Sequence, residues 1–350
     1  MKKICFIVSS ITDNGVTRVL SLLLNNIDLE KYNVNLININ KNTLDINYSD
    51  RINTIKLDNS RDKSDILNKI KRICRLRKEL KNNDYDEIIV LGDYAAIYAI
   101  IASFFLKIRI IVSERNDPNK EPQGNFKRKI RNLLFKRVDT LVCQTKDASK
   151  YYDSIVENRV VIYNPLKDDL PIGGNKRIKK IVNFCRLDAQ KNLFLLIDGF
   201  IEFNNSRDYI LEIYGDGPLK EELINYIAEK QQTNNIFVLP FNRDIHNIIK
   251  NYTMFISTSN YEGMSNSMIE SMAIGLPCIC TDCPIGGTKE VMENNKNGII
   301  IPCNDKKSLI LAMNKIVNDK DFSNYISNNA RTIREKLNAN KICQEWWKII

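Results

Sequence analysis

The sequence predicts an α/β protein built from two doubly wound parallel-sheet domains. Short apolar runs recur along all 350 residues, and amphipathic helical segments separate most of them. This alternation is typical of parallel sheets covered by helices. The chain is long enough for two domains with full-sized cores. A stretch with two prolines and two glycines, between Asn164 and Asn175, interrupts the pattern and is expected to join the domains.

The N-terminal half shows the alternation clearly. Residues 4–10 indicate a buried strand, and the loop after it leads through Gly15 into a helix. Further strands are expected at 33–39, 51–57, 87–91, 109–113, 139–143 and 159–163. Gly15 is the only glycine in that first loop, so the G-x-G-x-x-G fingerprint of dinucleotide binding is missing and an NAD-binding function is disfavoured.

The expected first domain spans 1–165, followed by a linker over 166–178 and a second domain over 179–337. The second domain continues the alternation, with strands expected near 181–185, 210–214, 236–240, 254–256 and 298–302. Residues 338–350 contain Trp346 and Trp347, and we expect them to form a helix that packs back toward the first domain.

Positive charge is concentrated in the N-terminal half of a chain whose net charge is +10. Two predicted helices carry much of it. The first spans 64–82 and is expected to turn inward the apolar residues Ile66, Ile70, Ile73 and Leu80. Its outer side carries a basic stripe formed by Lys71, Arg75 and Lys78.

The second basic helix is expected at 125–137. One of its sides is apolar and consists of Phe126, Ile130, Leu133 and Leu134. Around that side lie Lys127, Arg128, Lys129, Arg131, Lys136 and Arg137. One such helix is most often an ordinary solvated surface. Two in the same half favour contact with an anionic membrane surface or a phosphate-bearing acceptor.

Nine cysteines, an odd number, lie mostly in apolar strands, which favours reduced thiols and a cytoplasmic protein. One group, formed by Cys278, Cys280, Cys283 and Cys303, suggests a zinc site, but its apolar neighbours favour a core and no metal is expected. The N-terminus lacks a convincing secretory signal, and the longest apolar stretch, 95–106, is too short to span a bilayer.

The stretch 257–290 carries the clearest chemical signal. Two acids, Glu262 and Glu270, flank the start of a predicted helix capped by Ser265 or Asn266. The free N–H groups of such a helix start suit an anion, and the acids suit sugar hydroxyls. Other polar or glycine positions also follow predicted strands, where open α/β sheets bind ligands. They are Arg186, Lys191, Gly215, Gly217, Asn242 and Arg243, and the aromatic Phe241 directly precedes the last two.

Several motifs together resemble the retaining glycosyltransferases of family 4. They are RLDAQKN (186–192), YGDGPLKEEL (214–223) and EGMSNSMIESMAIGLPCICTD (262–282), with GVTR (15–18) and SERNDP (113–118) in the first half. Glu262 and Glu270 form an E-x₇-E pair, which by itself is weak evidence for the family. The motifs taken together, in this order, cover nearly the whole chain. The resemblance implies the GT-B fold, in which two Rossmann-like domains face each other across a cleft.

The resemblance also implies roles for residues. Arg186 and Lys191 would neutralise the donor diphosphate without a metal or other cofactor, and Glu262 would orient the transferred sugar. Glu270 would accept hydrogen bonds from the ribose. Donor-binding positions would be Glu270, Gly263, Met264, Ser265, Asn266, Gly215, Phe241, Asn242, Arg243 and Gly15. The sugar would be transferred with retention of configuration, because the acceptor attacks on the same face that the diphosphate leaves. The donor phosphate would take the acceptor's proton.

The acceptor side is expected at Glu114, Arg115 and Asn116, together with the basic stripe of Lys71, Arg75 and Lys78. Two positions depart from the family pattern. Val16 stands where many relatives have a second glycine, and Arg115 stands where many have a histidine. The only histidine, His246, is expected to be an exposed helical residue. The alternative for Glu114 and Arg115 is an ion pair that braces the loop.

The expected function is retaining transfer of a sugar from a nucleotide donor, with UDP favoured. The acceptor would be a lipid-linked or growing glycan in cell-surface polysaccharide or glycoconjugate synthesis, and the enzyme would lie on the inner face of the cell membrane. One alternative is a sugar-nucleotide epimerase or phosphorylase of the same fold. A basic nucleic-acid-binding protein is more distant, because the basic helices lack interleaved stacking aromatics.

Overall fold

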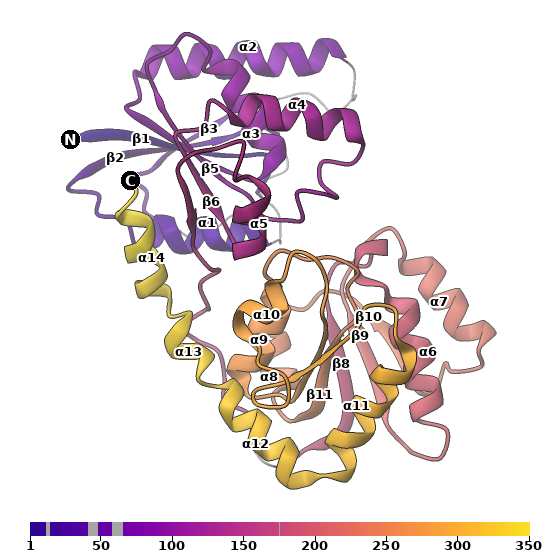
Figure 1. The fold of residues 1–350 in the computed structure, drawn as a ribbon. Coiled ribbons are helices and arrows are strands. Elements are labelled where there is room, and N and C mark those ends of the chain that lie inside the picture. The colour runs from indigo at the N-terminus through magenta and orange to yellow at the C-terminus, as the bar shows by residue number, and fades with distance from the viewer. Residues whose placement is uncertain (12–14, 41–47, 58–65, 175) are drawn as a thin grey trace. The chain divides into compact units, whose positions relative to one another are not determined.

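The computed structural model describes residues 1–11, 15–40, 48–57, 66–174 and 176–350. The chain divides into two compact units (Figure 1). Unit 1 comprises Met1–Pro165 together with Ala339–Ile350, and unit 2 comprises Leu166–Asn338. The stretch expected as a linker, 166–178, thus falls within unit 2. There Arg334 donates hydrogen bonds of 2.8 Å and 2.7 Å to the carbonyl oxygens of Leu170 and Pro171.

Unit 1 is built on a parallel sheet that has seven strands in the described part of the chain, in the order β3-β2-β1-β4-β5-β6-β7. Its strands are β1 (Lys2–Val8), β2 (Tyr32–Asn38), β3 (Asn53–Lys56), β4 (Glu87–Leu91), β5 (Arg109–Ser113), β6 (Thr140–Cys143) and β7 (Arg159–Val161). The strand order reverses direction between β1 and β4. Open α/β sheets bind ligands at the carboxyl ends of the strands at such a reversal.

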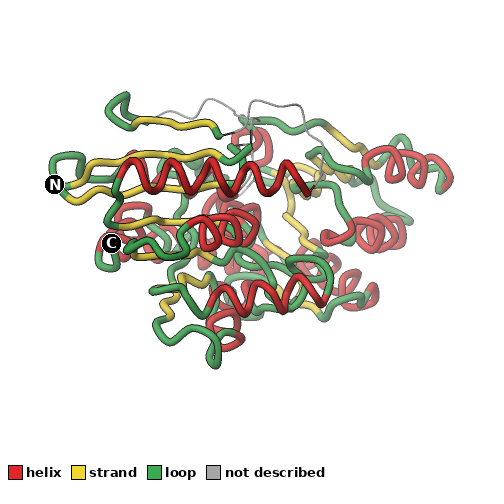
Figure 2. The backbone as a smooth tube through the Cα atoms, turned by 90° about the horizontal axis from the view of Figure 1, so that it is seen from above, coloured by secondary structure: helices red, strands yellow, loops and turns green. Residues whose placement is uncertain are grey.

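Helices cover both faces of this sheet (Figure 1). They are α1 (Gly15–Asn25), α2 (Ile66–Asn83), α3 (Asp93–Ala102), α4 (Asn125–Phe135), α5 (Lys146–Tyr151) and α14 (Ala339–Trp347). On one face α2 packs against α3, and α3 packs against α4, whereas α14 packs against α1. In Figure 2, α2 is the long helix in front and runs alongside the strands.

The inward face of α2 differs from the expected one. Arg72, Leu76 and Leu80 are buried, whereas Ile70 is half exposed and Ile73 is partly buried. The expected helix start at Ser64 and the side chain of Ile66 lie outside the described residues. The inward assignment of Ile70 is therefore wrong, because the helix is rotated so that Leu76 and Leu80 meet the core.

The apolar side of α4 faces solvent. Phe126 is 75% exposed and Leu133 is 66% exposed, and Ile130 is exposed as well. The residues that α4 buries are Arg131 and Phe135. The rotation of this helix is set by the partners of Arg131, which lie inside unit 1 and are described below.

Unit 2 repeats the plan with a parallel sheet that has six strands among the described residues, in the order β10-β9-β8-β11-β12-β13. They are β8 (Ile178–Phe184), β9 (Ile210–Tyr214), β10 (Ile236–Leu239), β11 (Tyr252–Ser257), β12 (Cys278–Thr281) and β13 (Ile299–Ile301). The order reverses between β8 and β11. The predicted fold class, two Rossmann-like parallel-sheet domains, is confirmed.

The helices of unit 2 lie between and after these strands. They are α6 (Leu193–Phe203), α7 (Lys220–Glu229), α8 (Ile245–Ile249), α9 (Asn266–Ile274), α10 (Gly287–Val291), α11 (Lys306–Asn318), α12 (Lys320–Ala330) and α13 (Ile333–Lys336), with a 3₁₀ turn at Ala189–Lys191. Helices α6 and α11 pack together over the sheet, and Phe200 and Leu309 are fully buried in the resulting core.

Helix α14 is an integral part of unit 1, although it is the last element of the chain. Trp346 is 1% exposed, and the sulfur of Cys343 lies 3.8 Å from the carbonyl oxygen of Leu22 in α1. Arg109 donates a 2.6 Å hydrogen bond to the carbonyl oxygen of Ile349. These contacts predict that the C-terminal residues contribute directly to the stability of unit 1.

Replacing Trp346 with alanine should lower the free energy of unfolding of unit 1 by about 3–5 kcal/mol, because a large buried ring is lost and a cavity is left. Denaturant unfolding followed by far-UV circular dichroism measures this change. Trp347→Ala is the matched control, because Trp347 is only partly buried. Equal destabilisation by the two variants would contradict the role given to Trp346.

Candidate functional site

The carboxyl ends of β8 and β11 bring together the predicted catalytic residues of unit 2. These strands pair side by side, so Arg186, just after β8, and Glu262, after β11, follow neighbouring strands at the same edge. Lys191 forms an ion pair with Glu262 through its Nζ and Oε1 atoms. Burial disfavours the charged form of Lys191, but the Glu262 carboxylate outweighs it and raises the pKa of Lys191. Lys191 is therefore a cation held in place.

Glu262 is fixed by further contacts. Its carboxylate accepts hydrogen bonds from Ser259 Oγ at 3.0 Å and from Gln190 Nε2 at 3.2 Å. The backbone N–H of Asn260 donates to the carbonyl oxygen of Gln190 at 2.8 Å. The loops after β8 and β11 are thus joined to each other. Donors from both loops thus hold the Glu262 carboxylate in one position.

Arg186 is the second predicted cation of the group. Its side chain is largely exposed, and its Nε lies 3.4 Å from the carboxylate of Asp188. It can therefore turn toward a ligand with little loss of packing. Lys191, in contrast, must divide its charge between Glu262 and any anion that binds beside it.

The start of α9 is capped at one of the two residues that the sequence predicted. Ser265 is the residue that caps the helix, and its Oγ accepts a 3.4 Å hydrogen bond from the N–H of Met268. Ser265 and Asn266 are partly exposed, whereas Gly263 and Met264 are buried. Gly263 packs against α10, since a Cβ added to Gly287 would lie 1.7 Å from the Gly263 carbonyl oxygen.

Glu270 and His246 form a buried pair that the sequence did not indicate. Glu270 Oε2 lies 2.7 Å from His246 Nε2. His246 is 8% exposed, so its assignment as an exposed helical residue is wrong. The short helix α8 turns it inward, where its ring also meets the edge of Phe184 at a centroid distance of 6.0 Å. One sequence feature could have pointed to His246 as a site residue: it follows the predicted base-binding loop at 241–243 by only three positions.

The glycines after β9 serve packing between loops. Gly215 has a φ of +153°, and a Cβ there would lie 1.9 Å from the carbonyl oxygen of Cys185. A Cβ on Gly217 would lie 2.3 Å from the carbonyl oxygen of Leu187. Both glycines therefore let the loop approach the segment that carries Arg186. Their contact with a ligand remains a prediction.

The predicted base-binding loop lies after β10. Phe241 is half exposed, and its N–H donates to Asp216 Oδ2 at 3.4 Å. Asn242 Oδ1 accepts a 2.8 Å hydrogen bond from the N–H of Asp244, and the side chain of Arg243 is exposed. The loop therefore offers an exposed aromatic ring beside polar backbone, but its ligand contacts also remain predictions.

In unit 1, Glu114 and Arg115 brace the loop after β5. Glu114 is buried, and its Oε1 accepts hydrogen bonds from the N–H groups of Arg115 at 2.8 Å and Asn116 at 3.0 Å. Arg115 donates to Asn164 Oδ1 at 2.8 Å and lies over the ring of Trp346. Burial lowers the pKa of Arg115 to about 10, against the opposing charge of Glu114. Of these three residues, Glu114 is the one that lies wholly inside the unit.

The remaining predicted positions of unit 1 lie on its surface. Gly15 is exposed at the first position of α1. Lys71, Arg75 and Lys78 are exposed along α2, and Arg75 also donates a 3.1 Å hydrogen bond to the carbonyl oxygen of Leu57. The basic stripe therefore has the exposure that was expected of it.

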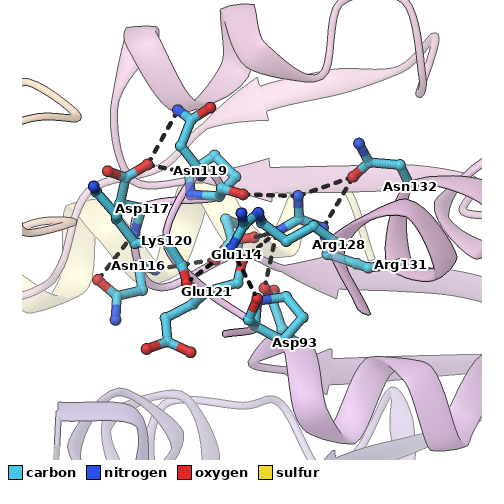
Figure 3. Close-up of polar contacts among 12 residues, drawn as sticks. Asp93, Glu114, Asn116, Asp117, Asn119, Lys120, Glu121, Arg128, Arg131 and Asn132 are labelled. Atoms are coloured by element: carbon cyan, nitrogen blue, oxygen red, sulfur yellow. Dashed lines mark hydrogen bonds and ion pairs between the residues drawn. The ribbon is translucent and has the colours of Figure 1, made fainter. Parts of the chain in front are cut away.

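A buried charge cluster underlies the loop after β5 (Figure 3). The guanidinium of Arg131, from α4, lies 3.3 Å from Asp93 Oδ2 and 4.0 Å from Glu114 Oε2. It also donates to the carbonyl oxygen of Pro118 at 2.9 Å. Tyr152 donates to Glu114 Oε2 at 2.6 Å. The cluster thus ties the helix to the ends of two strands.

Asp93 is protonated more readily than an ordinary aspartate. Burial raises its pKa well above the usual value, and the nearby Glu114 carboxylate raises it further, although Arg131 opposes both. Asp93 was not singled out in the sequence, and Arg131 was placed on a basic surface. The sequence offered one indication that Asp93 has a special position, since Gly92 and Asp93 directly follow a predicted buried strand.

The cysteines proposed and rejected as zinc ligands are free thiols in the structure. Burial raises the pKa of Cys278 and Cys283. Within the described ranges, no three His, Cys, Asp or Glu side chains gather where they could hold a metal ion. In the same part of the chain, no helix has the length and apolar character needed to cross a membrane.

Comparison with known families gives two matches. A model described as glycosyl transferases group 1 matches residues 169–333, and one described as glycosyl transferase 4-like matches residues 3–145. Among curated proteins, the chain is 25% identical over 359 residues to a Campylobacter jejuni enzyme, covering 100% of this chain and 98% of the relative. That enzyme is named GalNAc-α-(1→4)-GalNAc-α-(1→3)-diNAcBac-PP-undecaprenol α-1,4-N-acetyl-D-galactosaminyltransferase.

Solved structures share the fold over the whole chain. Sucrose-phosphate synthase from Thermosynechococcus elongatus matches with a TM-score of 0.86 at 14% identity, covering 100% of this chain and 98% of that one. HepE from Anabaena, in complex with UDP, matches with a TM-score of 0.81 at 17% identity, covering 100% and 99%. These structures show the fold, and the two family models agree with the glycosyltransferase family that the motifs predicted.

The raised pKa of Asp93 predicts a pH-dependent stability. The folded chain holds this proton more tightly than the unfolded chain, so the free energy of unfolding falls as the pH rises from about 4 toward the raised pKa. Asp93→Asn imitates the protonated acid and should remove that slope. Thermal unfolding across this pH range measures it.

Asp50→Asn is the matched control, because Asp50 is exposed in the same unit, and it should leave the slope unchanged. Arg131→Met should be far more damaging, by about 3–5 kcal/mol, because it leaves the buried Glu114 without its cation. An unchanged pH slope in Asp93→Asn would show that Asp93 is not the group that titrates.

Proposed function

This chain belongs to the glycosyltransferases of the GT-B fold, and we propose that it moves a sugar from a UDP-sugar to a lipid-linked or growing glycan acceptor with retention of configuration. The observation that carries the proposal is the Lys191–Glu262 ion pair where the neighbouring strands β8 and β11 end, with Arg186 in the same loop as Lys191. Glu270, held by His246, belongs to the same unit and lies in the helix after β11.

The leaving diphosphate is the group that the site must stabilise. Arg186 is largely exposed beside Asp188, and Lys191, five residues further along the same loop, is a cation paired with Glu262. The first turn of α9 adds N–H groups that carry partial positive charge. Together these donors supply the charge stabilisation that a bound metal supplies in other transferases, so we propose a metal-independent reaction.

The carboxylate of Glu270 is suited to the ribose diol. An ionised carboxylate accepts hydrogen bonds from two neighbouring hydroxyls. His246 holds one of its oxygens, so the carboxylate would meet the ribose in one orientation. The exposed ring of Phe241 is available to the base. The UDP complex of HepE, which has the same fold, supports uridine as the nucleoside.

The contacts of Glu262 favour retention without a protein nucleophile. Its oxygens already accept from Lys191, Ser259 and Gln190, and each of these bonds lowers its nucleophilicity. The acceptor hydroxyl would attack from the face that the diphosphate leaves. The departing phosphate oxygen would take the hydroxyl proton as the new glycosidic bond forms and the sugar–phosphate bond breaks.

The acceptor is proposed to carry a diphosphate and a lipid. The name of the Campylobacter jejuni relative describes a glycan linked through PP-undecaprenol. In this chain the exposed Lys71, Arg75 and Lys78 offer cations to such a diphosphate or to anionic lipid. We therefore propose that the enzyme works on the inner face of the cell membrane in the synthesis of a surface polysaccharide or glycoconjugate.

The proposed function is tested with a panel of UDP-, GDP- and ADP-sugars. Binding of the correct donor should raise the thermal midpoint, since a ligand at 100 times its Kd stabilises the fold by about 2.7 kcal/mol. Transfer to a polyprenyl-diphosphate glycan is then followed by NMR of the product. An inverted linkage would contradict retention, and epimerised donor without transfer would contradict a transferase.

The Glu270–His246 pair predicts a specific kinetic effect. Replacing His246 with alanine should raise KM for the donor about tenfold and change kcat less, because a hydrogen bond to a charged group contributes about 1.5–3 kcal/mol. Glu270→Ala should reduce donor binding more strongly. Asn247→Ala, at the exposed neighbour of His246, is the control. A donor KM unaffected by His246→Ala would remove the positioning role.

A further inference from the structure

Helix α4 has its apolar side outward, which is the reverse of an ordinary surface helix. Phe126, Ile130 and Leu133 recur at spacings of four and three, so they form one exposed stripe. We call these three residues the α4 face. Isolated exposed apolar residues are common, but a stripe of three large ones marks a surface that contacts something else.

The rotation of α4 is not free to change. Arg131 lies on the opposite side of the helix and is fully buried against Asp93 and Glu114. Its guanidinium also lies over the rings of Tyr151 and Tyr152 at 5.4 Å and 5.2 Å. Turning the α4 face inward would expose these partners and bring unpaired charges into the core. The apolar stripe is therefore held outward by the fold itself.

The loop between α3 and β5 extends the α4 face. The guanidinium of Arg137, one turn beyond Leu133, lies 4.2 Å from the ring centroid of Phe104. The next residue, Phe105, is 92% exposed and has a φ of +64°. Phe104 and Phe105 contact each other with ring centroids 6.1 Å apart. An exposed aromatic ring thus lies at the end of the stripe.

Positive charge borders the α4 face on both sides. At about 100° per residue, Lys127 lies along one edge of the stripe, and Lys129 and Lys136 lie along the other. All three are exposed. The segment 125–138 contains no acidic residue. Lysine stems at such edges cover apolar surface while their ammonium groups reach outward.

We propose that the α4 face and Phe105 form a membrane-docking surface that inserts into the interface of an anionic lipid bilayer. The apolar stripe would enter the boundary of the acyl chains, and the bordering lysines would contact lipid phosphates. The proposal rests on the proposed function, because a lipid-linked acceptor lies in such a bilayer. The new element is the surface that attaches the enzyme to the bilayer, which is the α4 face with Phe105.

An anionic bilayer fits this surface better than a protein partner. A second copy of the chain would bring an identical set of cations against the stripe, and like charges across an interface oppose association. A lipid interface instead offers phosphates at the level of the lysines and acyl chains at the level of the stripe. The basic stripe of α2, in the same layer of helices, adds attraction of the same sign.

Co-sedimentation with vesicles tests the proposal. The full chain is mixed with vesicles of phosphatidylcholine and phosphatidylglycerol, or of phosphatidylcholine alone. The variant Phe126→Gln/Ile130→Gln/Leu133→Gln should bind the anionic vesicles about tenfold or more weakly than the wild type. Leu311→Gln is the matched control, because Leu311 is 69% exposed on α11 of unit 2, and it should bind like the wild type.

Insertion is measured separately with Phe126→Trp. Its indole emission should shift to shorter wavelength with anionic vesicles, and brominated lipid should quench it. Vesicle binding that the triple variant does not weaken, or binding without shift and quenching, would overturn the proposal. A wild-type dimer that the triple variant makes monomeric would overturn it in favour of self-association.

The test is independent of the proposed function. Transfer to a water-soluble acceptor by the triple variant should equal transfer by the wild type, because none of the changed residues belongs to the donor or acceptor site. If the wild type binds vesicles through the α4 face but transfers no sugar, the proposed function fails and the docking surface stands. If it transfers sugar but the triple variant binds vesicles normally, the docking surface alone fails.

Discussion

The pairing of β8 with β11 is the constraint on which the candidate site depends. These strands lie side by side although 67 residues separate the end of one from the start of the next, because the strand order reverses between them. The reversal places the loop of Arg186 and Lys191 beside the loop of Glu262. Without it, the cations and the acid would follow distant strands, and neither the Lys191–Glu262 pair nor a shared anion site could form.

Buried charge is used differently in the two units. In unit 2 the Lys191–Glu262 pair lies at the carboxyl ends of the strands and keeps 16% and 13% of its side chains exposed, so a ligand anion can take part of the charge of Lys191. In unit 1 the Arg131 cluster lies inside the fold, where the guanidinium already has Asp93 and the Glu114 carboxylate as partners. Because breaking a fully buried pair costs more than rearranging a partly exposed one, the arrangement in unit 2 suits binding and the one in unit 1 suits structure.

The Arg131 cluster has consequences at the surface of unit 1. It holds α4 with its apolar stripe outward, and it supports the loop that Glu114 braces from below. The same buried cation thus links the predicted acceptor loop to the proposed docking surface. Helix α14 supports this loop from another direction, since Trp346 lies under Arg115. The last residues of the chain therefore stabilise a segment far away in the sequence.

The sequence by itself determined the fold class and the donor-side motifs. Short apolar runs predict strands that are buried on both faces of a parallel sheet. Arg186, Lys191 and Glu262 follow such runs, and open α/β sheets bind ligands at the carboxyl ends of their strands. Only the tertiary structure decided the rest. The Glu270–His246 pair and the Arg131 cluster join residues from different elements, which no local pattern encodes. The rotation of α2 and α4 was also missed, because helical periodicity identifies an apolar side but the partners of one buried arginine decided which side of α4 faces the core.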